Sequence, residues 1–357
     1  MYQYNLMLTS LLHTFHRYRT LQTDKIRALP IVILMPHSAC NCKCIMCDIW
    51  KGNTNLQQLT EKDISSLLYS LKKLGTRQVV MSGGEALLNP NFFKFCKMMK
   101  EAGIEVTLLS TGLSLKKHAA SLVTSVHDII VSLDGDEAVH DTIRNIPGAF
   151  YKLTEGVRHI KLLDPLLRVT ARCVIHQLNF RHWPSIIDSA QAIGLNQVSF
   201  LPADVSSAAF NREVPWDVNR QQQILISKEA LPELKSIIDG IIYNYKVAFT
   251  SKFIAESPEK LLKIYAYYAA FYGLNPFPYK KCNAPWVSTV IEADGTVKPC
   301  FFHEPIGNIR TASLNDILNN PKALNFRKTL NTDTNSTCVK CVCYLNLSPG
   351  TNLVKQS

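Results

Sequence analysis

From residue 31 onward, short apolar runs alternate with longer segments of helical periodicity, and this alternation constrains the fold more than any other feature. We predict strands at 31–35, 78–81, 104–109, 127–133, 168–175 and 197–201. The helices predicted between them lie at 60–74, 89–102, 113–124, 149–163 and 183–193. Strands that alternate with helices form a parallel sheet with helical crossovers. In such α/β folds, functional groups sit at the carboxyl ends of the strands.

The segments outside this pattern divide the chain further. We predict one amphipathic helix over 1–29, packed as a cap on the main domain by a stripe of Leu8, Leu11, Leu12 and Phe15. Two further helices are predicted at 231–245 and 258–272. The predicted regions are a helical cap (1–29), a strand–helix domain (30–225), a helical linker region (226–279), a small cysteine-rich domain (280–345) and a tail (346–357).

The composition is that of an ordinary folded protein, with 46% apolar and 19% charged residues. The net charge is +11, but the basic residues are spread along the chain, which favours a solvated surface over a nucleic-acid-binding one. No apolar run reaches the ~18 residues that a membrane span requires, and Met1–Leu29 lacks the pattern of a signal peptide. We therefore expect a cytoplasmic protein whose 11 cysteines serve metal binding or catalysis rather than disulfides.

Three of these cysteines directly follow the first predicted strand. Cys40, Cys44 and Cys47 have the spacing C-x3-C-x2-C. Three thiolates from one short loop can hold three irons of a [4Fe–4S] cube and leave the fourth iron open, as a catalytic metal site requires. A zinc ion needs a fourth protein ligand, for which Cys42 is the candidate. We expect the Cys42 side chain to point away from the other three in so tight a loop, which disfavours zinc.

Polar groups stand at the ends of later strands. Gly83 and Gly84 follow the second strand, where two glycines let the backbone approach a ligand closely and leave the Glu85 carboxylate available for a cation. An ordinary glycine turn is the alternative. Ser132 and Asp134 share one face at the end of the fourth strand, where they form either ligand contacts or a polar loop.

The fifth strand alternates polar and apolar residues. Its polar face includes Arg172 and His176, which we expect to point inward as ligand contacts or to form a structural ion pair. The other face carries Cys173, which we predict to be a buried, unreactive thiol. We predict the same for Cys96, which lies on the helix predicted at 89–102.

A second group of cysteines lies near the C-terminus. Its members are Cys282, Cys300, Cys338, Cys341 and Cys343. A hairpin predicted over 288–301, with Gly295 in its turn, brings Cys282 and Cys300 together in a C-x12-G-x4-C pattern, and the C-x2-C pair follows later. Four such ligands make a closed, structural site, which spacing alone assigns equally to zinc or to an iron–sulfur cluster.

The first cysteine loop resembles that of the radical S-adenosylmethionine (SAM) superfamily, whose SAM-cleaving [4Fe–4S] cluster follows the first strand of a partial (β/α)6 TIM-like barrel. Ser82-Gly-Gly-Glu85 is similar to the G-G-E motif of that family. The segments Val131-Ser-Leu-Asp-Gly135 and His140-Asp-Thr-Ile-Arg144 are similar to a later motif, in the same chain order. Met46 replaces the usual aromatic residue before the last cysteine. The resemblance implies SAM contacts from Met46, Gly83, Gly84, Glu85, Ser132, Asp134, Arg144 and Arg172.

The stretch Cys282–Cys300, followed by Ile306-Gly-Asn-Ile309, resembles the SPASM or twitch domains of the same superfamily, which carry auxiliary [4Fe–4S] clusters. The full SPASM pattern has more cysteines than the five in this region and binds a further auxiliary cluster. The resemblance therefore implies one auxiliary cluster, held by Cys282, Cys300, Cys338 and Cys341, with Cys343 as a spare or alternative ligand.

Taken with these motifs, the resemblance implies an enzyme that cleaves SAM reductively and abstracts hydrogen from its substrate, supplied with electrons by a one-electron donor such as flavodoxin or ferredoxin. The first cluster motif begins at residue 40, which leaves no room for the leader-binding domain of roughly 80 residues found in many peptide-modifying relatives. This favours a small molecule or a short peptide as substrate.

Two other functions remain as alternatives. An RNA-modifying enzyme would suit the positive charge, but no arginine-rich or aromatic-interleaved binding element is present. A non-catalytic metal-binding scaffold is the second alternative, and the intact cysteine triad together with Glu85 argues against it.

Overall fold

The computed structural model describes residues 2–212 and 214–351, with side chains from residue 11 onward. At its centre lies one sheet with the strand order β6-β5-β4-β3-β2-β1-β7-β8-β9. Strands β1 to β6 are parallel and follow one another in chain order, as predicted. They are β1 (Ile31–Leu34), β2 (Gln78–Met81), β3 (Glu105–Ser110), β4 (Asp128–Ser132), β5 (Arg168–Ile175) and β6 (Gln197–Pro202).

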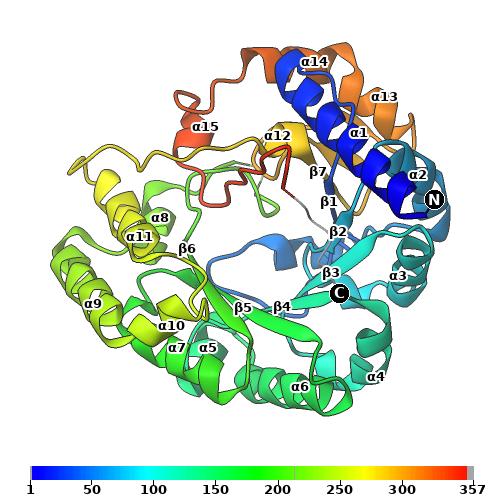
Figure 1. Ribbon diagram of the computed structural model, residues 1–357. Helices are drawn as coiled ribbons and strands as arrows, with labels where there is room; N and C mark the ends of the chain where they lie inside the picture. The colour runs from blue at the N-terminus through cyan, green and yellow to red at the C-terminus, as the bar shows by residue number, and fades with distance from the viewer. Residues whose placement is uncertain (1, 213, 352–357) are drawn as a thin grey trace.

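Helices cover the outer side of the curved row of strands (Figure 1). The crossovers contain α2 (Glu61–Lys73), α3 (Phe92–Glu101), α4 (Leu115–Ser125), α5 (Glu137–Arg144), α6 (Ala149–Leu163) and α7 (Trp183–Ala192). The later helices are α8 (Val218–Ile224), α9 (Leu231–Asn244), α10 (Lys246–Thr250), α11 (Pro258–Ala270), α12 (Ala284–Val287), α13 (Leu314–Asn319), α14 (Pro321–Thr329) and α15 (Ser336–Val339). Helix α5 is the one crossover helix without a counterpart in the sequence prediction. The arrangement is the predicted partial barrel.

The two faces of the barrel sheet differ as the sequence pattern of β5 predicts. Val169, Ala171, Cys173 and Ile175 are buried in the hydrophobic core, together with residues of α6 and α7. The alternate residues Arg172 and Val174 line an internal cavity instead. The period of two along the strand therefore separates a packed outer face from a functional inner face.

The cysteine-rich region begins with three further strands, β7 (Ser288–Ile291), β8 (Thr296–Lys298) and β9 (Gly307–Asn308). The predicted hairpin forms, because β7 and β8 are antiparallel and Gly295 adopts a φ of +88° in the turn. Strand β7 also pairs in parallel with β1, from Ile31 opposite Ser288 to Leu34 opposite Ile291. The region that the sequence predicts as a small domain thus continues the barrel sheet directly.

Helix α1 (Tyr2–Thr23) is shorter than the predicted helix over 1–29, and its apolar stripe is not its packed face. Leu11, Leu12 and Phe15 are 64%, 53% and 55% exposed, and the side chain of Leu8 lies outside the described residues. The predicted cap contact through this stripe is therefore wrong for Leu11, Leu12 and Phe15.

Polar groups attach the N-terminal segment to the C-terminal part of the chain, beside α14 (Figure 1). Arg17 is buried and donates a hydrogen bond of 2.8 Å to the backbone oxygen of Thr351. Trp286 donates a hydrogen bond of 2.8 Å to the side chain of Asp24. The hydrophobic periodicity of the sequence predicted the wrong face of α1 as the packed one. The observed contacts of this segment are hydrogen bonds, which a hydrophobic stripe cannot predict.

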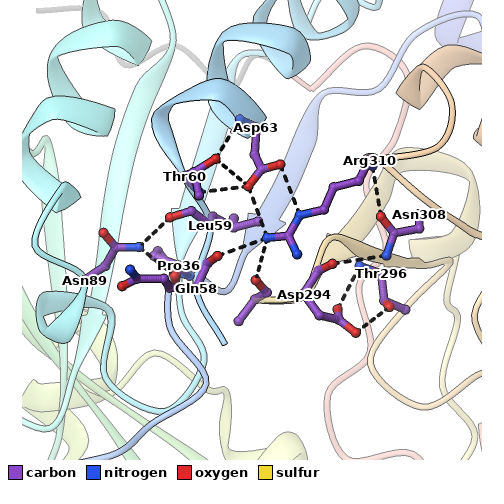
Figure 2. A network of polar contacts seen from close by, with 11 residues as sticks. Pro36, Gln58, Leu59, Thr60, Asp63, Asn89, Asp294, Thr296, Asn308 and Arg310 are labelled. Carbon is purple, nitrogen blue, oxygen red and sulfur yellow. Dashed lines mark hydrogen bonds and ion pairs between the residues drawn. The ribbon is translucent and has the colours of Figure 1, made fainter. Parts of the chain in front are cut away.

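A second polar contact joins the cysteine-rich region to the barrel (Figure 2). Arg310 donates hydrogen bonds of 3.2 Å to both carboxylate oxygens of Asp63 and one of 3.0 Å to the backbone oxygen of Gln58. Asp63 also forms a capping box at the start of α2: its side chain accepts a hydrogen bond from the backbone N–H of Thr60, and the Thr60 side chain accepts one from the backbone N–H of Asp63. The Asp63 carboxylate therefore caps the start of α2 and also binds the cysteine-rich region through Arg310.

Replacing Arg310 by methionine should lower the free energy of unfolding at neutral pH by about 1 kcal/mol, the upper end for an ion pair near the surface. Burial alone would raise the pKa of Asp63, but hydrogen bonds from Arg310 and Thr60 outweigh it and hold the pKa below its ordinary value of 3.8. A carboxyl group with a lowered pKa stabilises the fold above its unfolded pKa and loses this effect as pH falls. The difference between wild type and Arg310→Met should therefore shrink below about pH 4.

Urea unfolding at several pH values measures this difference. The control is Glu61→Gln, which removes the exposed Glu61–Lys94 pair on the same helix and should cost roughly 0.5 kcal/mol or less. Equal losses in the two variants would show that Arg310 does not clamp the two regions.

Candidate functional site

The first cysteine loop leaves β1 and lines a cavity of about 240 Å³ at the carboxyl ends of the barrel strands. We call it the first cavity. Nine residues that the sequence predicts as cofactor ligands or contacts line it: Cys40, Cys44, Met46, Cys47, Gly83, Gly84, Ser132, Arg144 and Arg172. They come from separate parts of the chain, and the parallel sheet brings them together because its strand ends share one edge.

The thiols of the first loop interact with one another. Cys42 is buried, and its hydrogen bonds to Cys40 and Cys44 lower the pKa of Cys40 and lower that of Cys44 to about 6. The expectation that the Cys42 side chain points away from these cysteines is therefore wrong, because it lies between them in the loop. Burial raises the pKa of the Cys47 thiol to about 12.

The loop also fits the ligand set of an iron–sulfur cube. No three Cys, His, Asp or Glu side chains within 2–212 and 214–351 converge closely enough to hold a single metal ion. In a cube each thiolate binds a different iron. Cys40, Cys44 and Cys47 come from one loop and line one cavity, which provides three such ligands.

The two glycines after β2 allow the second loop to touch the cysteine loop. A Cβ on Gly84 would lie 2.1 Å from the backbone oxygen of Ala39 and 3.0 Å from the backbone nitrogen of Cys40. Gly83 has a φ of +111°, which favours glycine. The backbone N–H of Glu85 donates a 2.9 Å hydrogen bond to the same Ala39 oxygen. The glycines therefore position Cys40, a role that adds to the predicted contact with a ligand.

Replacing Gly84 by alanine should push the backbone at Ala39 and Cys40 away from its present position. We expect the iron content of the first site to fall and SAM cleavage to drop roughly a hundredfold, as displacements of about 1 Å do in active sites. Iron analysis and a SAM-cleavage assay measure the two effects. Gly240→Ala is the matched control, because nothing lies within 4 Å of a Cβ there. Normal cleavage by Gly84→Ala would show that close contact between the loops is not required.

The carboxylate of Glu85 is fully buried and does not line the first cavity. It accepts hydrogen bonds from the Thr111 backbone N–H at 2.8 Å, the Thr111 hydroxyl at 2.7 Å and the Ser110 hydroxyl at 3.0 Å. Burial raises its pKa, against these hydrogen bonds. Ser110 and Thr111, which sequence reasoning missed, line the cavity. The polar Ser-Thr-Gly run that ends β3 is the signal for them. A direct contact of Glu85 with SAM stays a prediction.

Asp134 and Arg144 form a buried ion pair beside the cysteine loop. Arg144 also donates a hydrogen bond of 3.4 Å to the sulfur of Cys44. Burial works to lower the pKa of Arg144, but the negative charges of Asp134 and Cys44 outweigh it and raise the pKa. Asp134 itself does not line the first cavity. This pair therefore stabilises negative charge on the Cys44 sulfur, and SAM contacts from either residue stay predictions.

Arg172 lies where the first cavity meets two others, because it lines all three. In the described part of the chain its guanidinium makes no hydrogen bond or ion pair, and its Nε is buried without a partner. His176, the other candidate on β5, is fully buried and lines none of these three cavities, and burial lowers its pKa to about 4. Of the two, Arg172 is the one available to a ligand.

The C-terminal cysteines line a second cavity of about 340 Å³, which we call the auxiliary cavity. Its cysteines are Cys282, Cys300, Cys338, Cys341 and Cys343. Inner-face residues of β1 to β5 also line it, so it faces the lumen of the barrel. Burial raises the pKa of Cys300 to about 12 and that of Cys338 to about 11, and the neighbouring thiols add to both shifts. The predicted ligand set is thus gathered in one place.

The segment between β6 and α8 packs against the first cysteine loop and supports it. The sequence did not predict this contact. Trp216 donates a hydrogen bond of 2.6 Å to the carboxylate of Asp48, the residue after Cys47. The guanidinium of Arg212 stacks 3.8 Å from the Trp216 ring and pairs with Asp204 at 2.9 Å. The irregular composition of this segment gave no periodic signal, and only the aromatic and arginine content hints at a role.

Two protein-family models match this chain, one over each of the two cysteine sites. Residues 34–189 match the family model of the radical SAM superfamily, and residues 282–342 match SPASM, an iron–sulfur cluster-binding domain. The first match contains Cys40, Cys44 and Cys47, and the second contains Cys282, Cys300, Cys338 and Cys341. The two models confirm the resemblance drawn from the motifs, and they imply a [4Fe–4S] cluster with SAM in the first region and auxiliary iron–sulfur binding in the second.

Similar proteins carry different functions. The chain is 24% identical over 207 residues to the AdoMet-dependent heme synthase of Methanosarcina barkeri, a match covering 54% of this chain and 59% of the relative. It is 21% identical over 287 residues to the sporulation killing factor maturation protein SkfB of Bacillus subtilis, covering 78% of this chain and 62% of the relative. The chain thus spans about three-fifths of the length of each relative.

The crystal structure of Streptococcus suis SuiB bound to S-adenosylmethionine has the same fold, with a TM-score of 0.63 and 14% identity. The match covers 92% of this chain and 75% of SuiB. No helix within the described residues is long and apolar enough to cross a membrane.

Proposed function

Since the chain carries a radical SAM domain followed by a SPASM iron–sulfur domain, we propose that it is an oxidoreductase that cleaves SAM and abstracts hydrogen from a peptide or small-molecule substrate. The single observation that carries this proposal is the first cavity. It joins the three thiols of one loop to the ends of β2, β4 and β5 in about 240 Å³. When bound, the [4Fe–4S] cluster supplies the electron that converts SAM to methionine and a 5′-deoxyadenosyl radical.

The residues around the first cavity have separable tasks in this proposal. Cys40, Cys44 and Cys47 hold the cluster and leave one iron open to SAM. Met46 and Leu201 both supply apolar side chains to the cavity wall, suited to packing on adenine. Polar contacts to the ribose and amino acid of SAM come from the backbone at 83–84 and from Ser132. Trp216 holds the cysteine loop in place through its hydrogen bond to Asp48.

The substrate enters between the two cysteine sites. The auxiliary cavity faces the barrel lumen, and Arg172 lines both it and the first cavity. A substrate held there would lie between the first cavity and Cys282, Cys300, Cys338 and Cys341, which would hold an auxiliary cluster. Such a cluster would supply an electron acceptor for a net oxidation of the substrate. The proposal includes a one-electron donor such as flavodoxin or ferredoxin. It also includes a reducing, cytoplasmic location, since all 11 cysteines are free thiols.

Anaerobically reconstituted protein tests the proposal. With dithionite and SAM it should release 5′-deoxyadenosine and methionine in equal amounts, and neither should form without the reductant. Chromatography of the quenched reaction measures both products. Iron-loaded protein that binds SAM but yields no 5′-deoxyadenosine under reducing conditions would contradict the proposed function.

A further inference from the structure

A third cavity, of about 200 Å³, lies beside the first and has a strongly basic lining. We call it the basic cavity. It is enclosed by the ends of β5 and β6, by α11 and by the C-terminal loop at 341–344. Arg172, Leu201, Pro202 and Val342 line both this cavity and the first one, so its contents lie next to the SAM site. Its charged residues are Arg172, Glu256, Lys260, Lys263 and Lys280.

Two of the four cations are already engaged by the protein. Lys280 donates hydrogen bonds of 2.8 Å to the Val339 carbonyl and 2.6 Å to the Cys341 carbonyl, and its charge faces the auxiliary thiols. Thiolates that bind metal are negative, so Lys280 compensates that site. Lys263 donates a hydrogen bond of 3.2 Å to the Tyr279 carbonyl at the edge of the cavity.

Glu256 acts electrostatically on the other two cations, Arg172 and Lys260, but neither is bonded directly to the described part of the protein. Within the described residues, neither the guanidinium of Arg172 nor the ammonium group of Lys260 makes a hydrogen bond or ion pair. The one carboxylate in the lining, Glu256, accepts a 3.0 Å hydrogen bond from the Phe200 backbone N–H. Its single negative charge cannot balance both Arg172 and Lys260, which act on it electrostatically. The cavity therefore keeps a net positive charge and free donors.

We propose that the basic cavity binds a carboxylate of the substrate, held by Arg172 from β5 and Lys260 from α11. This inference rests on the proposed function, and it names the substrate class as a carboxylic acid or a peptide that presents one. A guanidinium offers two parallel donors that match the two oxygens of a carboxylate. Backbone N–H groups are the usual cradle of a phosphate, and the Phe200 N–H in this lining is already taken by Glu256. Arg172 thereby serves the substrate rather than SAM.

Binding of glutarate to the oxidised, cluster-loaded protein tests the inference by isothermal titration. Saturating SAM fills the site for the SAM carboxylate, and glutaramide is the neutral probe of the same shape. We expect glutarate to bind at least about tenfold more tightly than glutaramide, because a charge-assisted hydrogen bond is worth about 1.5–3 kcal/mol. Arg172→Met and Lys260→Met should each weaken glutarate about tenfold and leave glutaramide unchanged, and Lys260→Met, which lies outside the first cavity, should also leave SAM binding unchanged.

Two further variants separate charge from structure. Glu256→Gln removes the one carboxylate in the lining and should tighten glutarate binding roughly threefold, an improvement that a damaged fold would not give. Lys246→Met, on α10 and outside every cavity described above, should change nothing. Equal affinity for glutarate and glutaramide, or unchanged glutarate binding in either cation variant, would overturn the inference. Tighter binding of inorganic phosphate through the same two residues would overturn the assignment to a carboxylate.

The two proposals fail in different ways. SAM affinity and 5′-deoxyadenosine formation report on the proposed function and do not require the basic cavity. Protein that binds glutarate as expected but never cleaves SAM would contradict the proposed function alone. Protein that cleaves SAM but does not distinguish glutarate from glutaramide would contradict the carboxylate site alone.

Discussion

Replacing Cys40, Cys44 and Cys47 together by alanine should reduce 5′-deoxyadenosine formation by at least about a thousandfold, because no other thiol set lines the first cavity. The loss should be larger than for any other change at this site. Neighbouring contacts would adjust the geometry of the site, whereas these thiols are the predicted ligands of the iron itself. The assay is chromatographic detection of 5′-deoxyadenosine in anaerobic reactions with dithionite and SAM.

Cys96→Ala is the matched control for this variant. Cys96 is a fully buried thiol on α3, as predicted, and it lines none of the cavities described above. Its replacement should leave SAM cleavage close to the wild-type rate. A triple variant that still makes 5′-deoxyadenosine at the wild-type rate would falsify the assignment of these cysteines.

Most of the barrel could be predicted from the sequence because two local patterns of the chain point to the same fold. Strand-length apolar runs alternate with helical periodicity, and the strand ends carry cysteines, glycines and polar residues. The order of β1 to β6 in the sheet follows from parallel crossovers without further information. The inward direction of Arg172 follows from the period of two along β5.

Contacts between distant segments were not predictable in the same way. The hydrogen bond from Arg144 to Cys44 joins residues 100 positions apart, and the bond from Trp216 to Asp48 joins residues 168 positions apart. Neither leaves a periodic trace in the sequence. The motif resemblance predicts SAM as the partner of Arg144, whereas the structure shows Cys44 and Asp134 as its neighbours.

The boundary of the cysteine-rich region shows a further limit of sequence reasoning. A change of composition near residue 280 indicates a separate domain, yet β7 pairs with β1 along four residues. Parallel pairing between residues more than 250 positions apart cannot be read from local pattern. This continuity matters for the auxiliary site, because the hairpin that carries Cys300 is anchored to the barrel independently of any metal.

The auxiliary site should hold iron and sulfide even when the first site is lost. In the variant lacking Cys40, Cys44 and Cys47, we expect about four irons and four sulfides per chain, since four thiolates are the usual ligand set of a [4Fe–4S] cluster. Iron and sulfide analysis of the purified variant measures this directly. One zinc without sulfide would contradict an auxiliary cluster and its role as electron acceptor, and would leave the SAM-cleaving site untouched.

Removing the auxiliary ligands should loosen a limited part of the chain. Strand pairing to β1 and the Arg310–Asp63 contact hold the hairpin without metal. The segment around α15 depends on short-range contacts and on Lys280, which bonds to the carbonyls of Val339 and Cys341. In a variant with Cys338 and Cys341 replaced by serine, we therefore expect rapid tryptic cleavage at Lys340, while the barrel stays intact. Uniform unfolding of the whole chain would show instead that the auxiliary metal is required for the barrel sheet.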